Sequence, residues 1–402
     1  MTLMPVAEAL QRVLADAKPL PAEMAPLADV LDRVLTEDVA ALRTQPPAAV
    51  SAMDGYGVRA SDVAHAPVTL KLIGEVAAGH PFEGEVGPGE AARIFTGGVM
   101  PAGSDTVVIQ ELTSTDGKTV TIQKATTKGR NVRAQGIDFA LDQLLLRQGQ
   151  RLSDRDLMLA AAMNHPRLSV HRQPKVAVLG TGDELVSPGS KPNPGEIVYS
   201  NGFALTALAR NEGAIVSDLG IARDRITDIV AAVRRAREWG ADILVTSGGA
   251  SVGEHDLVQR ALASEGLDLS FWRVALRPGR PMMHGRLGDM QVLGVPGNPV
   301  SSYVCAFLFL VPLIRRLAGR LDVEHAPARA RLGRELPAND ERANYLRATL
   351  ELGSDGLVAM PLPDQDSSLM APLAKAACPV IREPHAPAAA AGSDCVILKL
   401  GL

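Results

Sequence analysis

The sequence predicts a multidomain α/β protein. A doubly wound, mainly parallel α/β domain is expected beside a small β domain, a discontinuous helical and extended domain, and a C-terminal domain like a β-barrel. Three observations lead to this prediction. The 402 residues are too many for one ordinary core, since a domain typically has ~100–200 residues. Residues 174–325 alternate between short apolar runs and segments with helical periodicity, and the flanking regions contain short β-type runs broken by Gly and Pro.

The first 173 residues are expected to form two domains. Residues 41–140 should be a separate small β domain, because they contain short β-type runs at 68–73, 92–95, 106–109 and 119–122. Helical segments flank this region at 5–16 and 153–163. The second opens with Ser153 and has Asp156 three residues later, which is typical of a capping box. We assign the flanks, 1–40 and 141–173, to one discontinuous domain.

Residues 174–325 are expected to form the doubly wound α/β domain. Strand-like runs alternate with helical segments in this order: strand 176–179, helix 202–211, strand 214–221, helix 225–239, strand 243–245, strand 292–295 and helix 300–317. In such sheets, ligands bind beyond the carboxyl ends of the strands. The tail, 326–402, has strand-like runs at 345–352, 357–360 and 395–400, which predict a small barrel or sandwich.

The composition is that of a soluble globular protein and argues against several classes of function. Hydrophobic residues make up 46% of the chain and charged residues 21%, so there is enough apolar surface for buried cores. The net charge of -4 and the 3% of aromatic residues argue against a nucleic-acid partner, which needs a basic face and rings for base stacking. An anionic ligand must therefore meet local positive charge.

The expected compartment is the cytoplasm, with no membrane partner. The N-terminus lacks the basic region and apolar core of a signal peptide. Three widely spaced cysteines, Cys305, Cys378 and Cys395, fit a reducing compartment. The longest apolar run, 303–314, contains Pro312 and is shorter than the ~20 residues of a membrane span, so we expect a buried helix.

A glycine-rich segment, TSGGASVGEHD at 246–256, follows the strand-like run 243–245 and precedes a helical pattern. Glycines let backbone N–H groups approach an anion closely, and the N-terminus of the next helix adds positive partial charge. A plain strand-to-helix turn is the alternative, and the segment alone does not decide between them. The candidate ligand-binding residues here are Thr246, Ser247, Gly248 and Gly249.

Two adjacent carboxylates, Asp183 and Glu184, follow the strand-like run 176–179 within the motif GTGDE. Carboxylates at the carboxyl end of a strand can hold Mg²⁺ and, through it, a phosphate. Capping of a helix N-terminus explains the same residues without a ligand. Asp224, at another strand end, has the same two interpretations.

Three arginines, Arg273, Arg277 and Arg280, lie around the turn RPGRP, which ends at Pro281. In a chain that is acidic overall, such arginines are candidates for a phosphate or oxyanion clamp. Solvated surface arginine is the alternative. The motifs SAMDGYG, FTGG and GRNVRAQGID are, by physical chemistry alone, turns that carry polar residues.

Taken together, these strings resemble the molybdopterin molybdenumtransferase family, the MoeA and gephyrin E-domain type. The matching motifs follow the family's order: SAMDGYGVR, FTGGVMPAGSD, GRNVRAQGID, LGTGDEL, TSGGASVGEHD, RPGRP and VPGNPVS. The tail motifs YLRAT and DSSLMAPLA also match, so the resemblance covers essentially the whole chain.

The resemblance implies a reaction in which adenylylated molybdopterin and molybdate give molybdenum cofactor and AMP, with Mg²⁺ assisting. It implies a homodimer, and as further partners a molybdopterin adenylyltransferase and the recipient molybdoenzymes. The matching positions held important for activity are Asp54, Thr96, Arg133, Asp138, Glu184, Asp224 and Asp256. We assign the metal ligands to Asp54, Asp183, Glu184 and Asp256, and the positions associated with molybdate are Ser301, Arg347 and Ser367.

The chain departs from the family pattern at two places. Arginine stands where the family usually has lysine at positions 273, 277 and 280, which keeps the charge and changes the geometry. Asp366 stands where the family has glycine, and it adds negative charge beside the tail serine. Two other functions stay open: molybdopterin adenylylation, whose catalysts resemble residues 174–325, and a noncatalytic dimeric scaffold or carrier for pterin or molybdate.

Overall fold

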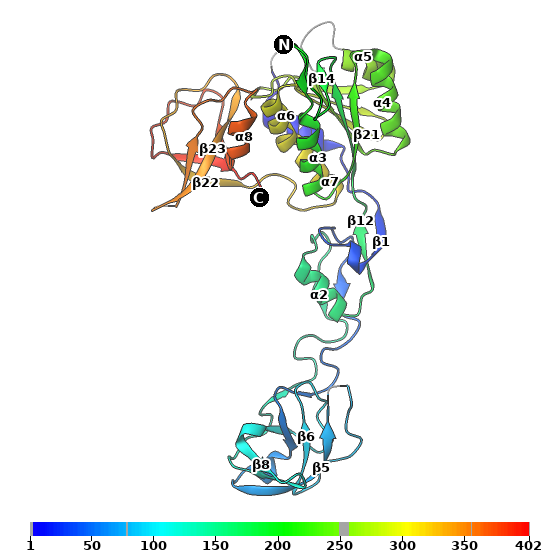
Figure 1. The fold of residues 1–402 in the computed structure, drawn as a ribbon, viewed down its shortest axis with the longest axis vertical. Helices are drawn as coiled ribbons and strands as arrows, with labels where there is room; N and C mark the ends of the chain where they lie inside the picture. Colours follow the sequence, from blue (N-terminus) through cyan, green and yellow to red (C-terminus); the bar gives the residue numbers. More distant parts are fainter. Residues whose placement is uncertain (1–2, 78, 249–256, 355, 402) are drawn as a thin grey trace.

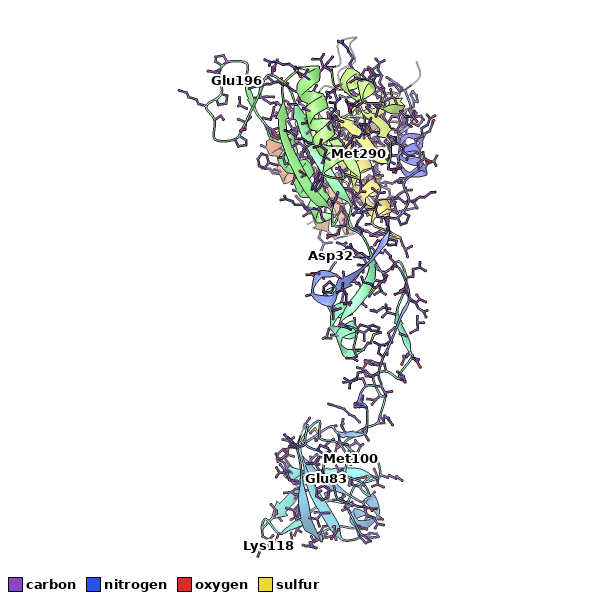
Figure 2. All side chains as sticks on the ribbon, turned by 90° about the vertical axis from the view of Figure 1, so that its right-hand side faces the viewer. Asp32, Glu83, Met100, Lys118, Glu196 and Met290 are labelled. Carbon is purple, nitrogen blue, oxygen red and sulfur yellow. The ribbon has the colours of Figure 1, made fainter. Side chains whose placement is uncertain are left out.

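The computed structural model describes residues 3–77, 79–248, 257–354 and 356–401. The molecule is multidomain and elongated (Figure 1). An α/β domain and a C-terminal β domain lie side by side at one end of the long axis, and a slender middle domain connects them to a small distal β domain. Figure 2, turned by 90°, shows the same separation, with Met100 and Lys118 in the distal domain and Met290 in the α/β domain.

The distal domain is built on one six-stranded sheet in the order β7-β4-β6-β5-β9-β8. Its buried residues form two apolar clusters, one of which contains Tyr56, Val108 and Ile122. The strands are β4 (Gly55–Val58), β5 (Val68–Val76), β6 (Glu90–Ile94), β7 (Thr106–Ile109), β8 (Thr113–Thr115) and β9 (Thr119–Ile122), with short pairs β3 (Val50–Ser51) and β10 (Val132–Arg133) beside the sheet. The β character predicted for this region is thus confirmed.

The middle domain is made from two separate parts of the chain. Strand β1 (Ala22–Pro26) pairs with β12 (Arg167–His171), and β2 (Val39–Ala40) pairs with β11 (Leu144–Leu146). Helix α2 (Asp154–Ala162) begins with the predicted capping box, because Ser153 and Asp156 each bond to the other's backbone N–H. Both parts share one apolar core.

Helix α1 (Val6–Ala15) differs from the domain range predicted for residues 1–40. Its buried face, which includes Ala9 and Val13, packs on the core of the α/β domain and not on the middle domain. The polypeptide therefore starts on the α/β domain, leaves it for the middle and distal domains, and returns at residue 175.

The α/β domain has a six-stranded sheet in the order β16-β13-β17-β21-β20-β18. The parallel strands are β13 (Lys175–Thr181), β16 (Ile215–Ala222), β17 (Ile243–Ser247) and β21 (Met290–Val295). At one edge, β18 (Asp268–Trp272) and β20 (Met283–Leu287) run antiparallel. Separate apolar cores cover the two faces, with α3 (Asn201–Asn211) and the helical run 299–317 on one, and α4 (Ile226–Glu238) and α5 (Leu257–Ser264) on the other. This is the predicted doubly wound, mainly parallel domain.

The helical run Pro299–Leu317 is a core helix. Within the described ranges it is the one helix long and apolar enough to cross a membrane, but 83% of it is buried inside the protein. It consists of α6 (Pro299–Cys305), a π-helical turn (Ala306–Leu310) and α7 (Val311–Leu317). The predicted buried helix is therefore present.

The C-terminal domain is a barrel. Its strands are β22 (Pro327–Leu332), β23 (Ala343–Gly353), β24 (Gly356–Pro361), β25 (Cys378–Arg382) and β26 (Asp394–Leu398), and pairing of β23 with β25 closes the circle. A short strand from the α/β domain, β19 (Leu276–Arg277), adds to β23, so the two domains share a sheet. Helix α8 (Met370–Lys375) lies between them.

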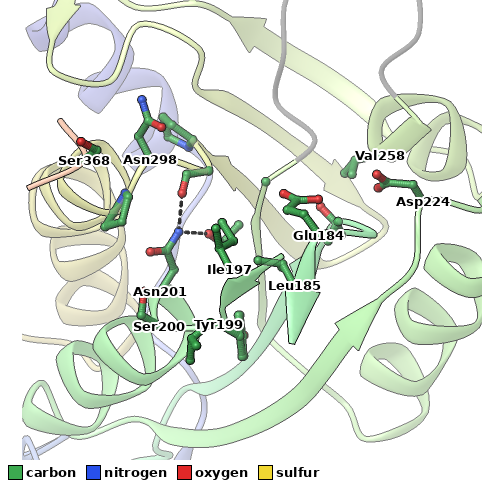
Figure 3. A pocket seen from close by; sticks show the side chains of 18 of the residues that line it. Glu184, Leu185, Ile197, Tyr199, Ser200, Asn201, Asp224, Val258, Asn298 and Ser368 are labelled. Atoms are coloured by element: carbon green, nitrogen blue, oxygen red, sulfur yellow. Dashed lines mark hydrogen bonds between the residues drawn. The ribbon is translucent and has the colours of Figure 1, made fainter. Parts of the chain in front are cut away.

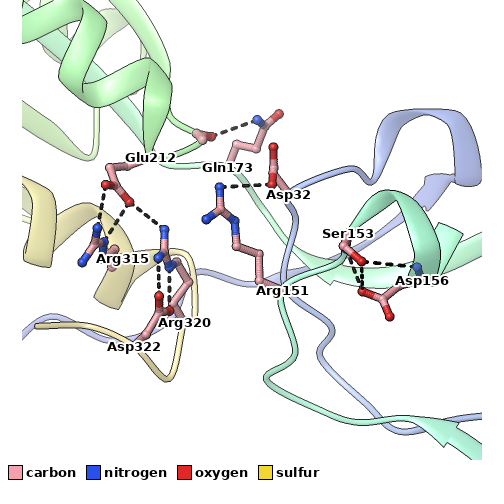
Figure 4. Close-up of polar contacts among 10 residues, drawn as sticks. Asp32, Arg151, Ser153, Asp156, Gln173, Glu212, Arg315, Arg320 and Asp322 are labelled. Carbon is pink, nitrogen blue, oxygen red and sulfur yellow. Dashed lines mark hydrogen bonds and ion pairs between the residues drawn. The ribbon is translucent and has the colours of Figure 1, made fainter. Parts of the chain in front are cut away.

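An ion pair between Arg172 and Asp242 ties the α/β domain to the neighbouring middle domain. Arg172 donates two hydrogen bonds to Asp242, at 2.9 and 2.7 Å. Within the α/β domain, Glu212 at the end of α3 accepts from Arg315 and Arg320 at 2.7 and 2.6 Å (Figure 4). Burial opposes ionisation of Glu212, but the Arg315 hydrogen bond and the two guanidinium charges outweigh it and lower the pKa of this carboxyl. The two arginines thus hold a charged carboxylate in place at the end of α3.

Candidate functional site

A cavity of about 1000 Å³ lies at the carboxyl ends of the parallel strands. We call it the main pocket. The ends of β13 and β17, the start of α3, the turn before α6, and Ser368 and Met370 from the barrel side all line it (Figure 3). Its position is the one that the doubly wound topology predicts for a ligand.

One end of the main pocket carries carboxylates. Glu184 and Asp224 both line it, from loops that follow β13 and β16 (Figure 3). The backbone N–H of Asp183 donates to Asp224 at 3.4 Å, and the N–H of Asp224 donates to Asp183 at 3.3 Å. The structure therefore brings these three predicted residues together from two strands.

Within the described ranges, no three Asp, Glu, His or Cys side chains are grouped closely enough to hold a metal ion by themselves. Two of the predicted site residues, Gly249 and Asp256, lie outside the described residues, so their contribution is not part of this finding. The oxygen donors present match the preference of Mg²⁺, which proteins usually hold with one or two carboxylates together with substrate phosphates.

The start of the glycine-rich segment shapes the pocket wall. Gly248 has a φ of 98°, and a Cβ there would lie 2.5 Å from the carbonyl oxygen of Thr181, so a side chain does not fit. Ser247 lines the pocket, whereas Thr246 is fully buried in the sheet. The glycine is therefore required for the close approach of β17 to β13.

Asn201, which the sequence analysis missed, connects two sides of the main pocket. Its side-chain amide donates to the Ser247 hydroxyl at 2.8 Å and to the carbonyl of Gly297 at 2.7 Å (Figure 3). Asn201 is the first residue of α3, and an Asn or Ser at a helix start was the available signal. That signal indicates a cap, and it does not show which loop lies opposite.

The other end of the pocket is uncharged and joins the α/β domain to the barrel. Asn298 donates to the hydroxyl of Ser367 at 3.0 Å, and the N–H of Val300 donates to the carbonyl of Ser367 at 3.0 Å. Ser301 is buried in α6. Asp366 accepts from the hydroxyl and N–H of Ser368, and these bonds lower the pKa of its carboxyl.

Arg347 holds the loop that carries these serines. Its side chain is 3% exposed, and it donates to the Gln365 side chain and to the carbonyls of Leu369 and Asp364, each at 3.3 Å. The predicted molybdate contact of Arg347 therefore requires a change of these partners on binding. In the structure its geometric role is to shape the loop 364–369.

The three candidate clamp arginines do not line the main pocket, although Pro281 does. Pairing of β19 with β23 turns Arg277 toward the barrel, where its guanidinium lies 3.8 Å from Asp340 and faces a second cavity of about 370 Å³. Arg273 is partly buried with a φ of 96°, and Arg280 is exposed. The three arginines thus lie outside the lining of the main pocket, and their role as an oxyanion clamp stays a prediction.

The remaining predicted residues lie in or beside the distal domain. The carboxylate of Asp54 accepts from the N–H and the hydroxyl of Thr96, at 2.7 and 2.8 Å. The bond from the Thr96 N–H, followed by the one from its hydroxyl, lowers the pKa of Asp54. Arg133 lies on β10 beside β3, and the N–H of Asp138 donates to the carbonyl of Gln45. The middle domain separates this group from the main pocket of the same chain (Figure 1).

Family models match three consecutive parts of the chain. Residues 4–164 match the MoeA N-terminal region (domain I and II), residues 177–316 match a probable molybdopterin binding domain, and residues 329–400 match the MoeA C-terminal region (domain IV). Together these matches include both candidate groups of residues.

Curated relatives and a solved structure agree with the family models. The molybdopterin molybdenumtransferase of Nostoc sp. is 38% identical over 76% of this chain and 72% of its own length. The enzyme of the same name from Bacillus subtilis is 33% identical over 93% of this chain and 89% of its own. The crystal structure of a molybdopterin biosynthesis MoeA protein from Pyrococcus horikoshii matches with a TM-score of 0.85 and 30% identity, over 100% of both chains.

Proposed function

The chain belongs to the MoeA family of molybdopterin molybdenumtransferases, and we propose that it inserts molybdenum from molybdate into adenylylated molybdopterin with release of AMP. It is a transferase of molybdenum cofactor biosynthesis. The observation that supports the finer proposal is the main pocket, which has carboxylates at one end and uncharged hydroxyl and amide groups at the other.

The pocket suits a long substrate with a phosphate and flat rings. The pocket is also lined by aliphatic side chains, which can lie against the face of a heteroaromatic ring: Leu185, Ile197, Val198, Leu257 and Val258. The volume of about 1000 Å³ is at the upper end of the usual range for small-molecule sites. Because the pterin substrate brings its own dithiolene sulfurs, the protein needs no cysteine ligand there, and Cys305 and Cys378 are buried elsewhere.

Mg²⁺ is the cofactor that we propose for the carboxylate end. Glu184 and Asp224 would hold it, with Asp183 fixing the loop between them through the two backbone bonds. A bound Mg²⁺ supplies positive charge to phosphate oxygens, and the release of AMP breaks a bond at phosphorus. The protein's own groups orient the substrate: Asn201 holds the Ser247 loop, and Asn298 holds Ser367 at the opposite end.

We propose a homodimer in which each site combines residues of both copies. Asp54, Thr96, Arg133 and Asp138 lie in or beside the distal domain, and the Glu184 group lies in the main pocket of the α/β domain. One chain cannot bring the two groups together while it keeps this elongated shape. A second, antiparallel copy can place its distal domain against the pocket.

The direct test is product analysis after the protein is mixed with adenylylated molybdopterin, molybdate and Mg²⁺. We expect AMP and molybdenum cofactor in equal amounts, and no cofactor without molybdate. If the protein instead consumes ATP with molybdopterin alone, the adenylyltransferase alternative is correct. If the protein is a scaffold or carrier, its Asp54→Asn variant should still restore cofactor synthesis in a deletion strain. If the protein is the catalyst, this variant should not restore it.

A further inference from the structure

Arg93 occupies a position in the distal domain from which it contacts both sides of the Asp54–Thr96 pair. It lies on β6 directly opposite Tyr56 on β4. Its guanidinium carbon is 5.0 Å from the centroid of the Tyr56 ring and 4.8 Å from that of Phe95. A cation placed over aromatic faces is attracted by them, so the two rings restrict where the guanidinium can lie.

The same guanidinium donates two hydrogen bonds. One goes to the carbonyl of Gly55 at 3.2 Å, and the other goes to the side chain of Gln110 at 2.6 Å. The backbone N–H of Gln110 in turn donates to the carbonyl of Asp54 at 3.1 Å. Gly55 packs closely on β7, because a Cβ there would lie 2.0 Å from the carbonyl oxygen of Val108 and no side chain fits.

These contacts connect two turns that are far apart in the sequence. Gly55 and Tyr56 directly follow Asp54, and Phe95 directly precedes Thr96. Arg93 therefore touches the neighbours of both partners, while the carboxylate itself bonds to Thr96. A planar guanidinium with donors on two edges can do this, and neither a lysine nor a neutral side chain reproduces all of these contacts.

We propose that Arg93 is a positioning residue, which fixes Asp54 and Thr96 relative to each other for the transfer reaction. The proposal rests on the proposed function for its catalytic consequence, but the positioning itself does not. In this role Arg93 acts through the Gly55 carbonyl, the Gln110 side chain and the Phe95 ring, which adjoin the two turns. A surface arginine without this role would leave the Asp54–Thr96 hydrogen bonds unchanged when removed.

The first readout is hydrogen exchange of the Thr96 amide, measured on the full-length protein. In Arg93→Gln we expect exchange at least about tenfold faster, since local opening of the pair becomes easier. Lys71→Gln is the matched control: it removes a cation from the neighbouring strand β5, where Lys71 is paired with Glu90. Unchanged exchange at Thr96 in Arg93→Gln overturns the proposal.

The second readout is steady-state kinetics with adenylylated molybdopterin and molybdate. We expect turnover of Arg93→Gln to fall about tenfold or more, with both saturation curves within twofold of wild type, because the pair is displaced and the substrate pocket is intact. Arg93→Lys, which keeps a cation between the rings, should recover part of the turnover. A shift in saturation at unchanged turnover would assign Arg93 to binding and overturn the positioning role.

The two readouts separate the proposals. If the wild type makes no cofactor, the proposed function fails, and the exchange of Thr96 still decides whether Arg93 holds the pair. If exchange accelerates while turnover of an active enzyme is unchanged, Arg93 is structural and the catalytic part is wrong. If Arg93→Gln does not fold, both measurements are made on Arg93→Lys. This variant keeps the positive charge but lacks the planar fork, so we expect it to lose the Gly55 contact.

Discussion

At the scale of single residues, a substitution at Asp54 distinguishes a chemical role of its carboxylate from a role in packing. Its carboxylate is exposed and accepts both Thr96 bonds on one oxygen, which the amide oxygen of asparagine can also do. We therefore expect Asp54→Asn to keep the melting temperature of the wild type. Release of AMP should fall by about 100-fold or more if this carboxylate handles a proton or a metal ion. Turnover within a few-fold of wild type would mean that Asp54 is a turn residue only.

The arginines of the RPGRP turn give a second test. Arg277 lies near Asp340, whereas the side chain of Arg280 is exposed and has no polar partner among the described residues. Arg280 can thus turn toward an oxyanion without losing a side-chain hydrogen bond or ion pair to any residue that the structure describes. We expect Arg280→Ala to raise the concentration of molybdate or pterin substrate needed for half-saturation by about tenfold. Charge-assisted hydrogen bonds contribute roughly 1.5–3 kcal/mol. Arg277→Ala should have a smaller effect.

For the lysine variants at both positions, the substrate concentration needed for half-saturation should lie between those of the wild type and the alanine variant. An ammonium keeps the positive charge but lacks the planar fork of a guanidinium. Saturation by each substrate is measured separately at fixed ionic strength. Unchanged curves for both alanine variants would show that the two arginines are solvated surface charges, and that the oxyanion is bound by other groups.

At the scale of elements, a proline and a histidine together explain the π-helical turn in the core helix. The N–H of Val311 donates to Ala306, five residues back, so the carbonyl of Phe307 would next need an N–H from residue 312. That residue is Pro312, which has none. The ring of His325 takes its place: Nε2 bonds to the Phe307 carbonyl at 2.6 Å, and the ring stacks on Phe307.

This arrangement predicts a loss of stability in mild acid. Burial lowers the pKa of His325 below its ordinary value of 6.5, although the Phe307 bond partly opposes this. The unfolded chain thus binds a proton more readily, so the stabilisation is present above pH 6.5 and is lost as pH falls toward the folded-state pKa. We expect the melting temperature to drop between pH 7.5 and 5.5.

His325→Phe keeps the ring stacking but removes the titrating group. Its melting temperature should be lower at pH 7.5, because the Phe307 carbonyl loses its partner, and should depend less on pH. Buried His284, whose pKa is also lowered by burial, contributes to the dependence that remains. Equal pH slopes for the variant and the wild type would show that His325 does not titrate with folding.

Elements were predictable where the local sequence decides the structure. The capping box at Ser153 and the apolar run of β13 are visible in the sequence and are present in the structure. Strands β18 and β20 were missed: β20 reads Met-His-Gly-Arg-Leu, and its buried His284 is accommodated only by a bond to Gln291 on the next strand. That partner follows from strand pairing, which no local pattern contains.

The site was predictable to the same extent. Glu184 and Asp224 follow strands whose carboxyl ends must meet, so their proximity follows from the topology. Asn201 and Ser368 were missed because their importance depends on which segments lie opposite them. The arginine clamp was expected from spacing alone, and pairing of β19 with the barrel directs Arg277 elsewhere.

At the scale of the whole molecule, the elongated shape is the feature that most constrains function. Asp54 and Glu184 lie in domains at opposite ends of the molecule's long axis, with the middle domain between them (Figure 1). The ion pair of Arg172 with Asp242 ties the middle domain to the α/β domain. This contact favours a fixed distance between the distal domain and the main pocket. A complete site must then use residues of two copies.

The most direct test of this account is the activity of verified heterodimers of Asp54→Asn and Glu184→Gln, measured as AMP and molybdenum cofactor formed per dimer. Both mutant homodimers should be inactive, since every site in them lacks one carboxylate. The heterodimer should show about half of wild-type activity, because one of its two composite sites carries both substitutions and the other carries neither. A heterodimer that forms no product would contradict the shared site and place all of these residues within one copy.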